Sequence, residues 1–322
     1  MWSTQTNSTV PLAAVKPLEG LVSYRSYCLH ATHQALTHSR RPRERSPITG
    51  ARLVPVGDIE GLPYARCPDT GSLFLAQLPE PARWAELLKD VNQYRHSPGA
   101  FHADLNQSRA EHVYAPKLEW IKETLRLQQL ECPRVLEVVT PPSDFTGLMA
   151  EADWCTEVLT VDEMSLISSA PAGQQHKQVQ AAVLLESLDR VDDPVALTKA
   201  IWDRLASGGL VFMTALVASG FDLAVLGLKS LYLYPPDRAN CFTLRGLSML
   251  LEQAGFHLLE VSTPGVLDVE IVTAHCARDP SVDLSPFERQ LIESDQHTKD
   301  EFQAFLQQRG LSSFARMVMK KP

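Results

Sequence analysis

Acidic side chains accompany two predicted β-strands in the middle of the chain, and Asp162 and Glu163 lie at the carboxyl end of the second one. The strand at 135–139 carries Glu137, and the strand at 157–161 is followed by Asp162. Both are short apolar runs rich in β-branched residues, of the kind buried in a parallel sheet. In an open α/β sheet, ligands bind beyond the carboxyl ends of the strands. Asp162 and Glu163 are therefore candidate ligand-binding residues, with a solvated strand end as the alternative.

A second group of charged side chains follows the third predicted strand, 178–185. Glu186, Asp189 and Arg190 come directly after it and precede a helix. Taken alone, such a cluster indicates in part a solvated helix cap stabilised by ion pairs.

The loop after the first strand lacks the glycines that a nucleotide-type cofactor site needs. Residues 139–143 read Val-Thr-Pro-Pro-Ser. Glycine lets the backbone approach such a ligand, because a Cβ atom would collide with it. Pro141 and Pro142 also remove two backbone N–H donors. The order of strand, loop, helix and strand thus predicts a cofactor site, whereas the loop argues against one.

The remaining elements complete an α/β sheet. Strand, helix and Gly-Gly turn follow one another through residues 178–214, which is a βαβ unit. Helices are predicted at 84–94, 116–130, 145–152, 195–205 and 243–255, with a polar helical region at 285–306; further strands are predicted at 210–214, 256–261, 269–274 and 314–319.

Two copies of the turn x-Pro-x-x-Gly occur near the N-terminus, at 46–50 and 67–71. Two such turns with cysteine at both ends would hold a tetrahedral zinc ion. Here the four ligand positions are Ser46, Thr49, Cys67 and Thr70. One thiol cannot bind structural zinc, so we predict that the two-turn β scaffold remains without the metal.

The first 45 residues have weak apolar periodicity and few acids, which predicts a flexible arm. The same composition would suit an organellar transit peptide. Cys28, His30, His33 and His38 match no standard zinc spacing, so they indicate no metal site.

Composition limits the class of protein. The 322 residues are 44% apolar and 21% charged, and the formal net charge is −8. An acidic balance argues against binding of nucleic acid through overall charge, and no apolar run approaches the ~20 residues of a membrane-spanning helix. The six cysteines form no close pair, which favours reduced thiols in a cytoplasmic protein.

In their order and spacing, residues 134–274 resemble a class I S-adenosylmethionine-dependent methyltransferase. The segments that carry the resemblance are VLEVV at 135–139, VLTVD at 158–162, LLESLDRVDDP at 184–194, LASGGLVFMT at 205–214, PPDRANCFTLRGLSMLLEQAGF at 235–256 and STPGVLDVEIV at 262–272. Residues 46–319 as a whole are similar to a bacterial subgroup with an N-terminal zinc ribbon. The resemblance implies a Rossmann-like methyltransferase sheet with flanking helices, preceded by a small zinc-ribbon-like β segment.

Four regions follow from this reading. They are a flexible N-terminal arm at 1–45, a degenerate zinc-ribbon-like segment with its helix at 46–95, a methyltransferase-like α/β domain at 96–279 and a C-terminal helical extension at 280–322.

The resemblance also implies where S-adenosylmethionine would bind. Glu137 takes the place of the acid in the first strand, and Asp162 that of the acid that holds the ribose hydroxyls. The three glycine positions of the family's loop fall on Val139, Pro141 and Ser143.

The acceptor side is implied by two further motifs. The family's W-H-x-x-E-H signature falls on Leu185, Glu186, Asp189 and Arg190, of which only the acid is partly kept, and Glu186, Asp189 and Arg190 are the catalytic candidates. The PPxHxN stretch places Arg238 and Asn240, with Tyr232 nearby, as substrate-binding candidates.

Three functions remain open. The first is a non-catalytic pseudo-methyltransferase that binds a partner protein or serves as a subunit. The second is an active methyltransferase for a small-molecule or sugar-type acceptor. The third is a site for another ligand in the same cleft. The family's loop glycines, zinc thiols and signature histidines are replaced here by other residues, which favours the non-catalytic function.

Overall fold

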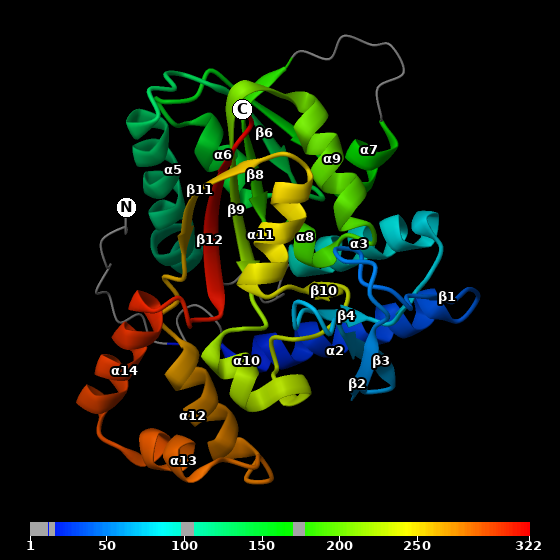
Figure 1. The fold of residues 1–322 in the computed structure, drawn as a ribbon, viewed down its shortest axis with the longest axis vertical. Coiled ribbons are helices and arrows are strands. Elements are labelled where there is room, and N and C mark those ends of the chain that lie inside the picture. The colour runs from blue at the N-terminus through cyan, green and yellow to red at the C-terminus, as the bar shows by residue number, and fades with distance from the viewer. Residues whose placement is uncertain (1–11, 13–16, 98–105, 170–177) are drawn as a thin grey trace.

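The computed structural model describes Leu12 and residues 17–97, 106–169 and 178–322 (Figure 1). None of the helices in these ranges is long and apolar enough to cross a membrane.

A six-stranded sheet forms the centre of the fold, in the order β11-β12-β9-β8-β6-β7. Its strands are β6 (Arg134–Val138), β7 (Glu157–Val161), β8 (Val179–Leu185), β9 (Leu205–Leu216), β11 (His257–Ser262) and β12 (Phe314–Lys320). Strands β7, β6, β8 and β9 are parallel, whereas β12 is antiparallel to both β9 and β11. This is the Rossmann-like methyltransferase sheet that the sequence predicts.

Helices cover both faces of this sheet because alternate strand residues point to opposite sides. On one face, α5 (Ala115–Leu127) and α6 (Asp144–Ala150) pack on a cluster that includes Val135, Val183 and Phe212. On the other, α7 (Glu163–Ser168), α9 (Pro194–Arg204) and α11 (Leu244–Gln253) pack on Leu136, Leu184 and Met213. The sheet is thus buried from both sides, as its apolar strands require.

The predicted strand at 269–274 is wrong, because these residues form part of helix α12 (Asp268–Arg278). A short apolar run cannot be assigned to strand or helix from periodicity alone. Its place in the sheet is taken by β12, which pairs with β9 from Phe314 to Lys320. The predicted helical region at 285–306 is two helices, α13 (Pro286–Glu293) and α14 (Gln296–Gln308).

The N-terminal region differs from the flexible arm that we expected. Residues 1–11 and 13–16 lie outside the described residues, but Leu18–Leu36 form helix α2. Leu21, Tyr24 and Cys28 are buried in a cluster that also contains Trp84 of α3 (Pro81–Arg95). Figure 1 shows α2 in blue beside α3. Weak apolar periodicity hid a helix whose buried side includes polar and small residues, Thr32 and Ala35 among them.

The region of the two turns forms an antiparallel sheet in the order β10-β4-β3-β2. Its strands are β2 (Val54–Ile59), β3 (Leu62–Arg66), β4 (Leu73–Leu75) and β10 (Asn240–Cys241), while β1 (Arg41–Pro42) pairs separately with β5 (Gln77–Leu78). Because β10 comes from the α/β part of the chain, the predicted boundary between residues 95 and 96 separates segments that share one sheet.

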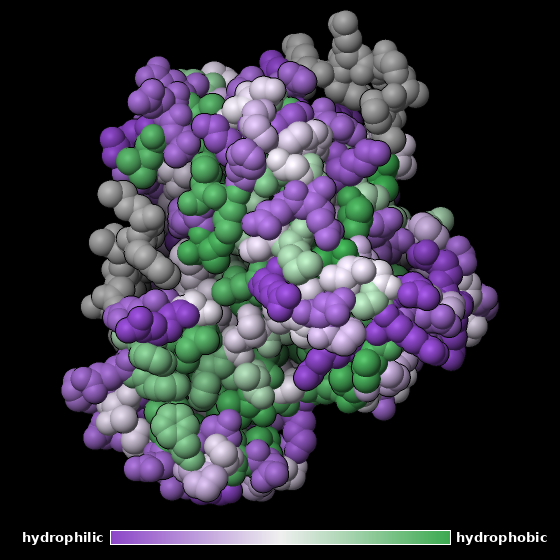
Figure 2. All heavy atoms as spheres, viewed as in Figure 1, coloured by the Kyte–Doolittle hydropathy of each residue, from purple (hydrophilic) through white to green (hydrophobic). Residues whose placement is uncertain are grey.

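Shorter elements connect these parts. They are α4 (Asn106–Arg109), the π-helical turn η2 (Ala110–Tyr114), α8 (Ser187–Arg190), α10 (Phe221–Leu226) and the 3-10 turn η3 (Gly227–Lys229). Figure 2 shows apolar side chains over the lower part of the visible face, where Figure 1 places α10, α12 and α14. Phe305 of α14 is 44% exposed.

Candidate functional site

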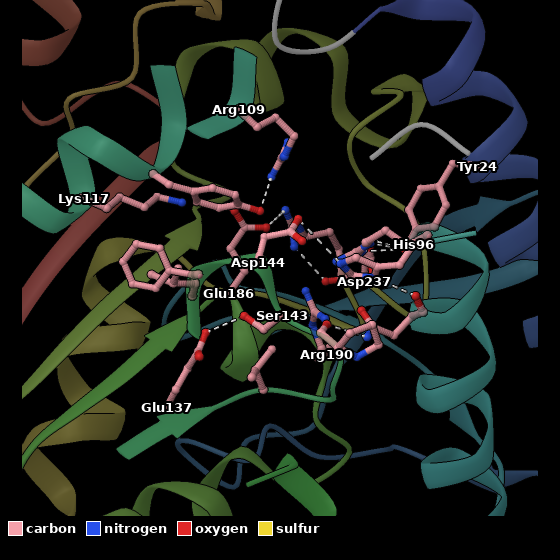
Figure 3. A pocket seen from close by; sticks show the side chains of 18 of the residues that line it. Tyr24, His96, Arg109, Lys117, Glu137, Ser143, Asp144, Glu186, Arg190 and Asp237 are labelled. Carbon is pink, nitrogen blue, oxygen red and sulfur yellow. Dashed lines mark hydrogen bonds and ion pairs between the residues drawn. The ribbon is translucent and has the colours of Figure 1, made fainter. Parts of the chain in front are cut away.

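A cavity of ≈170 Å³ opens at the carboxyl ends of β6 and β8 (Figure 3). Its wall includes seven residues that the sequence singles out: Glu137, Val139, Ser143, Glu186, Arg190, Tyr232 and Arg238. The ends of the parallel strands therefore bring the predicted cofactor loop, the predicted catalytic segment and the predicted acceptor segment to one place.

Four other candidates are not part of the cavity wall. Asp189 is fully buried, and Pro141 is exposed. Asp162 caps α7, where its carboxylate accepts a hydrogen bond from the Ser165 amide at 2.9 Å. Asn240 is fully buried and donates hydrogen bonds to the carbonyl oxygens of Leu188 and Val191, at 2.8 and 2.7 Å.

Ser143, one of the three predicted glycine positions, binds the acid of the first strand. The Ser143 hydroxyl donates a hydrogen bond to Glu137 at 2.8 Å and caps the start of α6, and the Thr146 hydroxyl also donates to Glu137. Burial raises the pKa of Glu137, and the two hydroxyl groups offset only part of this effect. The acid that the resemblance assigns to the cofactor is therefore engaged by the loop itself.

A side chain from α3 fixes the same loop from outside. Asn92 is 3% exposed, and its amide donates to the carbonyl oxygens of Thr140 and Pro142 at 2.8 and 3.1 Å. Buried carbonyl groups need such donors. The loop between β6 and α6 is thus tied to the N-terminal half of the chain.

Three charged residues form a network at the ends of β8 and of the 232–238 segment. Arg238 lies 2.5 Å from the Glu186 carboxylate and 3.4 Å from that of Asp189. Burial would raise the pKa of Glu186, but Arg238 holds it well below its usual range. Arg238 lies farther from Asp189 than from Glu186, and it does not offset the effect of burial there. Burial raises the pKa of Asp189 to about 8. One guanidinium therefore compensates one of two carboxylates.

The raised pKa of Asp189 predicts a pH-dependent stability. In the unfolded chain an aspartate titrates near about 3.9, so between that pH and about 8 the folded state holds a proton that the unfolded state has lost. The free energy of unfolding should fall as the pH rises through this window. Asp189→Asn, which cannot ionise, should flatten this dependence in urea denaturation between pH 5 and pH 8. An equal slope in the variant and the wild type would contradict the assignment.

A second network, which sequence analysis missed, also lines the cavity. Arg95 pairs with Asp237 and donates to the Tyr24 hydroxyl at 2.5 Å, and that hydroxyl donates to Asp237 at 3.1 Å. Burial alone would raise the pKa of Asp237, but Arg95 lowers it. The three residues come from α2, α3 and the 232–238 segment. No local pattern links them, although Asp237 stands beside a residue that we singled out.

The helices before β6 supply further cations. Arg109 lies 5.3 Å from the centre of the Tyr114 ring, and the Lys117 amino group lies 5.9 Å from it. Lys117 is only 5% exposed and also lies 5.5 Å from the centre of the Phe314 ring. Figure 3 shows Arg109 and Lys117 reaching toward the pocket from this side. The predicted helix at 116–130 includes Lys117, but the amphipathic pattern of that helix gave no reason to place the Lys117 side chain in a binding site.

The four positions of the two N-terminal turns converge, as the zinc-site comparison predicts. Hydrogen bonds from Ser46, Thr70 and Thr49 surround the buried Cys67 thiol, with Thr49 Oγ1 at 3.5 Å. Burial would raise the pKa of this thiol, but these bonds lower it to about 7. Within the described ranges, no group of three or more His, Cys, Asp and Glu residues is placed to hold a metal ion.

Restoring thiols at these positions should therefore restore a metal site. We expect the combined variant Ser46→Cys, Thr49→Cys and Thr70→Cys to bind about one zinc ion per chain, because four thiolates form a structural site. Atomic absorption on purified protein would measure this, with the three alanine substitutions as the control. A full equivalent of zinc in the wild type, or none in the cysteine variant, would contradict this account.

Comparisons with known proteins concern the fold. No protein-family model and no curated protein matches the chain. Among solved structures, the plantazolicin methyltransferase in complex with S-adenosylhomocysteine is 12% identical, with a TM-score of 0.39 over 74% of this chain and 98% of that one. A methyltransferase from Archaeoglobus fulgidus is 13% identical, with a TM-score of 0.38 over 63% and 94%. A Thermotoga maritima methyltransferase is 15% identical, with a TM-score of 0.37 over 69% and 96%. We draw no conclusion about activity or ligands from similarities at this level.

Proposed function

We propose that the protein is a non-catalytic member of the methyltransferase fold, with a binding or subunit role rather than methyl transfer. The observation that carries the proposal is the loop from Val139 to Ser143. Side chains of Val139, Pro142 and Ser143 line the cavity where a cofactor of this fold needs bare backbone.

The size and extent of the cavity support the same proposal. Its volume of ≈170 Å³ is below the ~300–1,000 Å³ of typical small-molecule sites. A bound S-adenosylmethionine would have to reach from Glu137 to Asp162. Asp162 is not among the residues that line the cavity, and its carboxylate caps α7.

The charged residues at the signature positions are poorly suited to proton transfer. A general base works best when its pKa is near the operating pH, whereas Arg238 keeps the pKa of Glu186 well below its usual range. Asp189 is fully buried and does not line the cavity. The guanidinium group of Arg190 offers only N–H donors and no acceptor atom.

Thermal unfolding with S-adenosylhomocysteine tests the proposal. A ligand present at 100 times its dissociation constant stabilises by about 2.7 kcal/mol, which would raise the melting temperature by roughly 4 °C in a protein of this size. We expect no rise in the wild type at ~1 mM ligand, the excess that a ~10 µM site would require. A rise that disappears in Asp162→Ala and persists in the control Asp153→Ala would instead establish the alternative, an active methyltransferase-type site.

A further inference from the structure

We propose that Arg190 anchors a binding site for a small anionic molecule in the strand-end cavity, and that the bound group is a carboxylate or a phosphate. The inference goes beyond the proposed function, because it stands whether or not S-adenosylmethionine binds. It assigns the cavity a ligand chemistry of its own.

The Arg190 side chain is buried without a partner. It is 6% exposed, it lines the cavity, and its Nε atom is buried with no hydrogen bond. Among the described residues, no hydrogen bond or ion pair involves its guanidinium group. Figure 3 shows Arg190 among the side chains of the pocket. A buried cation without a counter-charge is costly unless something compensates it.

The acids on which Arg190 acts through space already have other partners. Asp189 lies 3.4 Å from Arg238 and accepts a hydrogen bond from the Leu216 amide at 3.0 Å. Glu186 pairs with Arg238, and Asp237 pairs with Arg95. Glu163 accepts a hydrogen bond from the Thr140 hydroxyl at 2.8 Å. Arg190 lowers the pKa of Glu163 through space, but burial outweighs this effect, and the pKa of Glu163 is raised. These pairings therefore leave Arg190 without a carboxylate of its own.

The backbone around Arg190 is held rigidly. The Trp84 indole donates a hydrogen bond to the Arg190 carbonyl oxygen at 2.9 Å, and Trp84 is fully buried. Asn240 binds the carbonyl groups of Leu188 and Val191 on either side. An anchored arginine loses little freedom when it binds a ligand, which favours affinity.

A guanidinium group selects for oxyanions because its planar N–H fork matches two oxygens of a carboxylate or phosphate. Arg109 and Lys117 line the same cavity and add positive charge on the far side. At ≈170 Å³, the cavity holds on the order of ten water-sized volumes. It therefore has room for one such group with a short body attached.

Melting temperatures at constant ionic strength test the site. We expect sodium phosphate or sodium acetate to raise the melting temperature of the wild type over sodium chloride by about 2–4 °C at saturating concentration. The two salts distinguish a phosphate from a carboxylate ligand. The rise should be absent in Arg190→Gln, smaller in Arg190→Lys, which keeps the charge without the fork, and complete in Arg126→Gln. Arg126 is the matched control, because its side chain is 69% exposed outside the cavity.

Two results would overturn the proposal. One is a wild type that neither anion stabilises beyond chloride. The other is an anion effect of the same size in Arg190→Gln. If Arg190→Gln does not fold, the lysine variant decides, since an unchanged dissociation constant for the better anion would equally refute the role of Arg190. The test uses no adenosyl ligand, so its outcome is separate from that of the proposed function.

Discussion

Arg238→Met is expected to lower the free energy of unfolding by about 3–5 kcal/mol at pH 8, because removal of one partner leaves buried charge uncompensated. Arg238 lies 2.5 Å from Glu186 and 3.4 Å from Asp189, and its own side chain is 13% exposed. Without it, burial would be opposed only by Lys117 and Arg190 at Glu186, and by the Leu216 amide and Arg190 at Asp189. The pKa values of Glu186 and Asp189 should rise in the folded variant.

This loss of stability should depend on pH. Carboxyl groups with raised pKa values in the folded state destabilise it increasingly as the pH rises. The difference between Arg238→Met and the wild type should therefore be smaller at pH 5 than at pH 8, as measured by urea denaturation at both values. Arg126→Gln, an exposed arginine on α5, should change stability by less than about 0.5 kcal/mol. A loss of equal size at both pH values would mean that packing rather than charge explains the effect.

Asn240→Ala is expected to lower the free energy of unfolding by about 2–4 kcal/mol, since each buried polar group left unpaired costs about 1–3 kcal/mol. The Asn240 amide donates to the carbonyl groups of Leu188 and Val191, and its Oδ1 atom accepts from Arg43 at 2.6 Å. All of these contacts lie inside the protein. The variant would also loosen the turn that carries Arg190.

Two comparison variants sharpen this prediction. Asn240→Asp keeps the shape but loses the two N–H donors, so it should be destabilised as well. Gln93→Ala removes an exposed side-chain amide of α3 and should change stability by less than about 0.5 kcal/mol. If Asn240→Ala were as stable as Gln93→Ala, Asn240 would be free for the acceptor-binding role that the sequence motif suggests.

Much of the central sheet could be predicted from the sequence because its strands are buried on both faces. Apolar runs such as 135–139 and 178–185 have few other places in a globular fold. The starts of two predicted helices have a local chemical reason, because Asp193 before Pro194, and Thr243, are residues that favour helix starts. Asp193 caps α9 and Thr243 caps α11.

The site could be predicted only where its residues follow strand ends. Glu137, Glu186 and Arg190 reach the cavity because the topology carries them there. Tyr24 and Arg95 could not be found in this way, because they come from helices whose docking depends on tertiary packing. The sequence motif suggested a substrate-binding role for Asn240, whereas its amide is buried and binds backbone carbonyl groups. A motif gives the position of a residue in the chain but not the groups that its side chain will bind.

The loop and the charge networks lead to one account of the cavity. Hydroxyl groups of the loop engage Glu137, Arg238 engages Glu186, and Arg95 engages Asp237. Side chains that could have served a cofactor or an acceptor are thus used within the protein. The cavity that remains is small, and the guanidinium group of Arg190 lines it without a carboxylate partner among the described residues.

Titration calorimetry of the wild-type protein with S-adenosylmethionine and S-adenosylhomocysteine tests the central claim most directly. The account predicts no heat of binding for either compound at ~1 mM, a concentration that would reveal any affinity stronger than about −4 kcal/mol. Micromolar binding that is lost in Asp162→Ala would contradict it, because the loop from Val139 to Ser143 would then accept the cofactor despite its side chains.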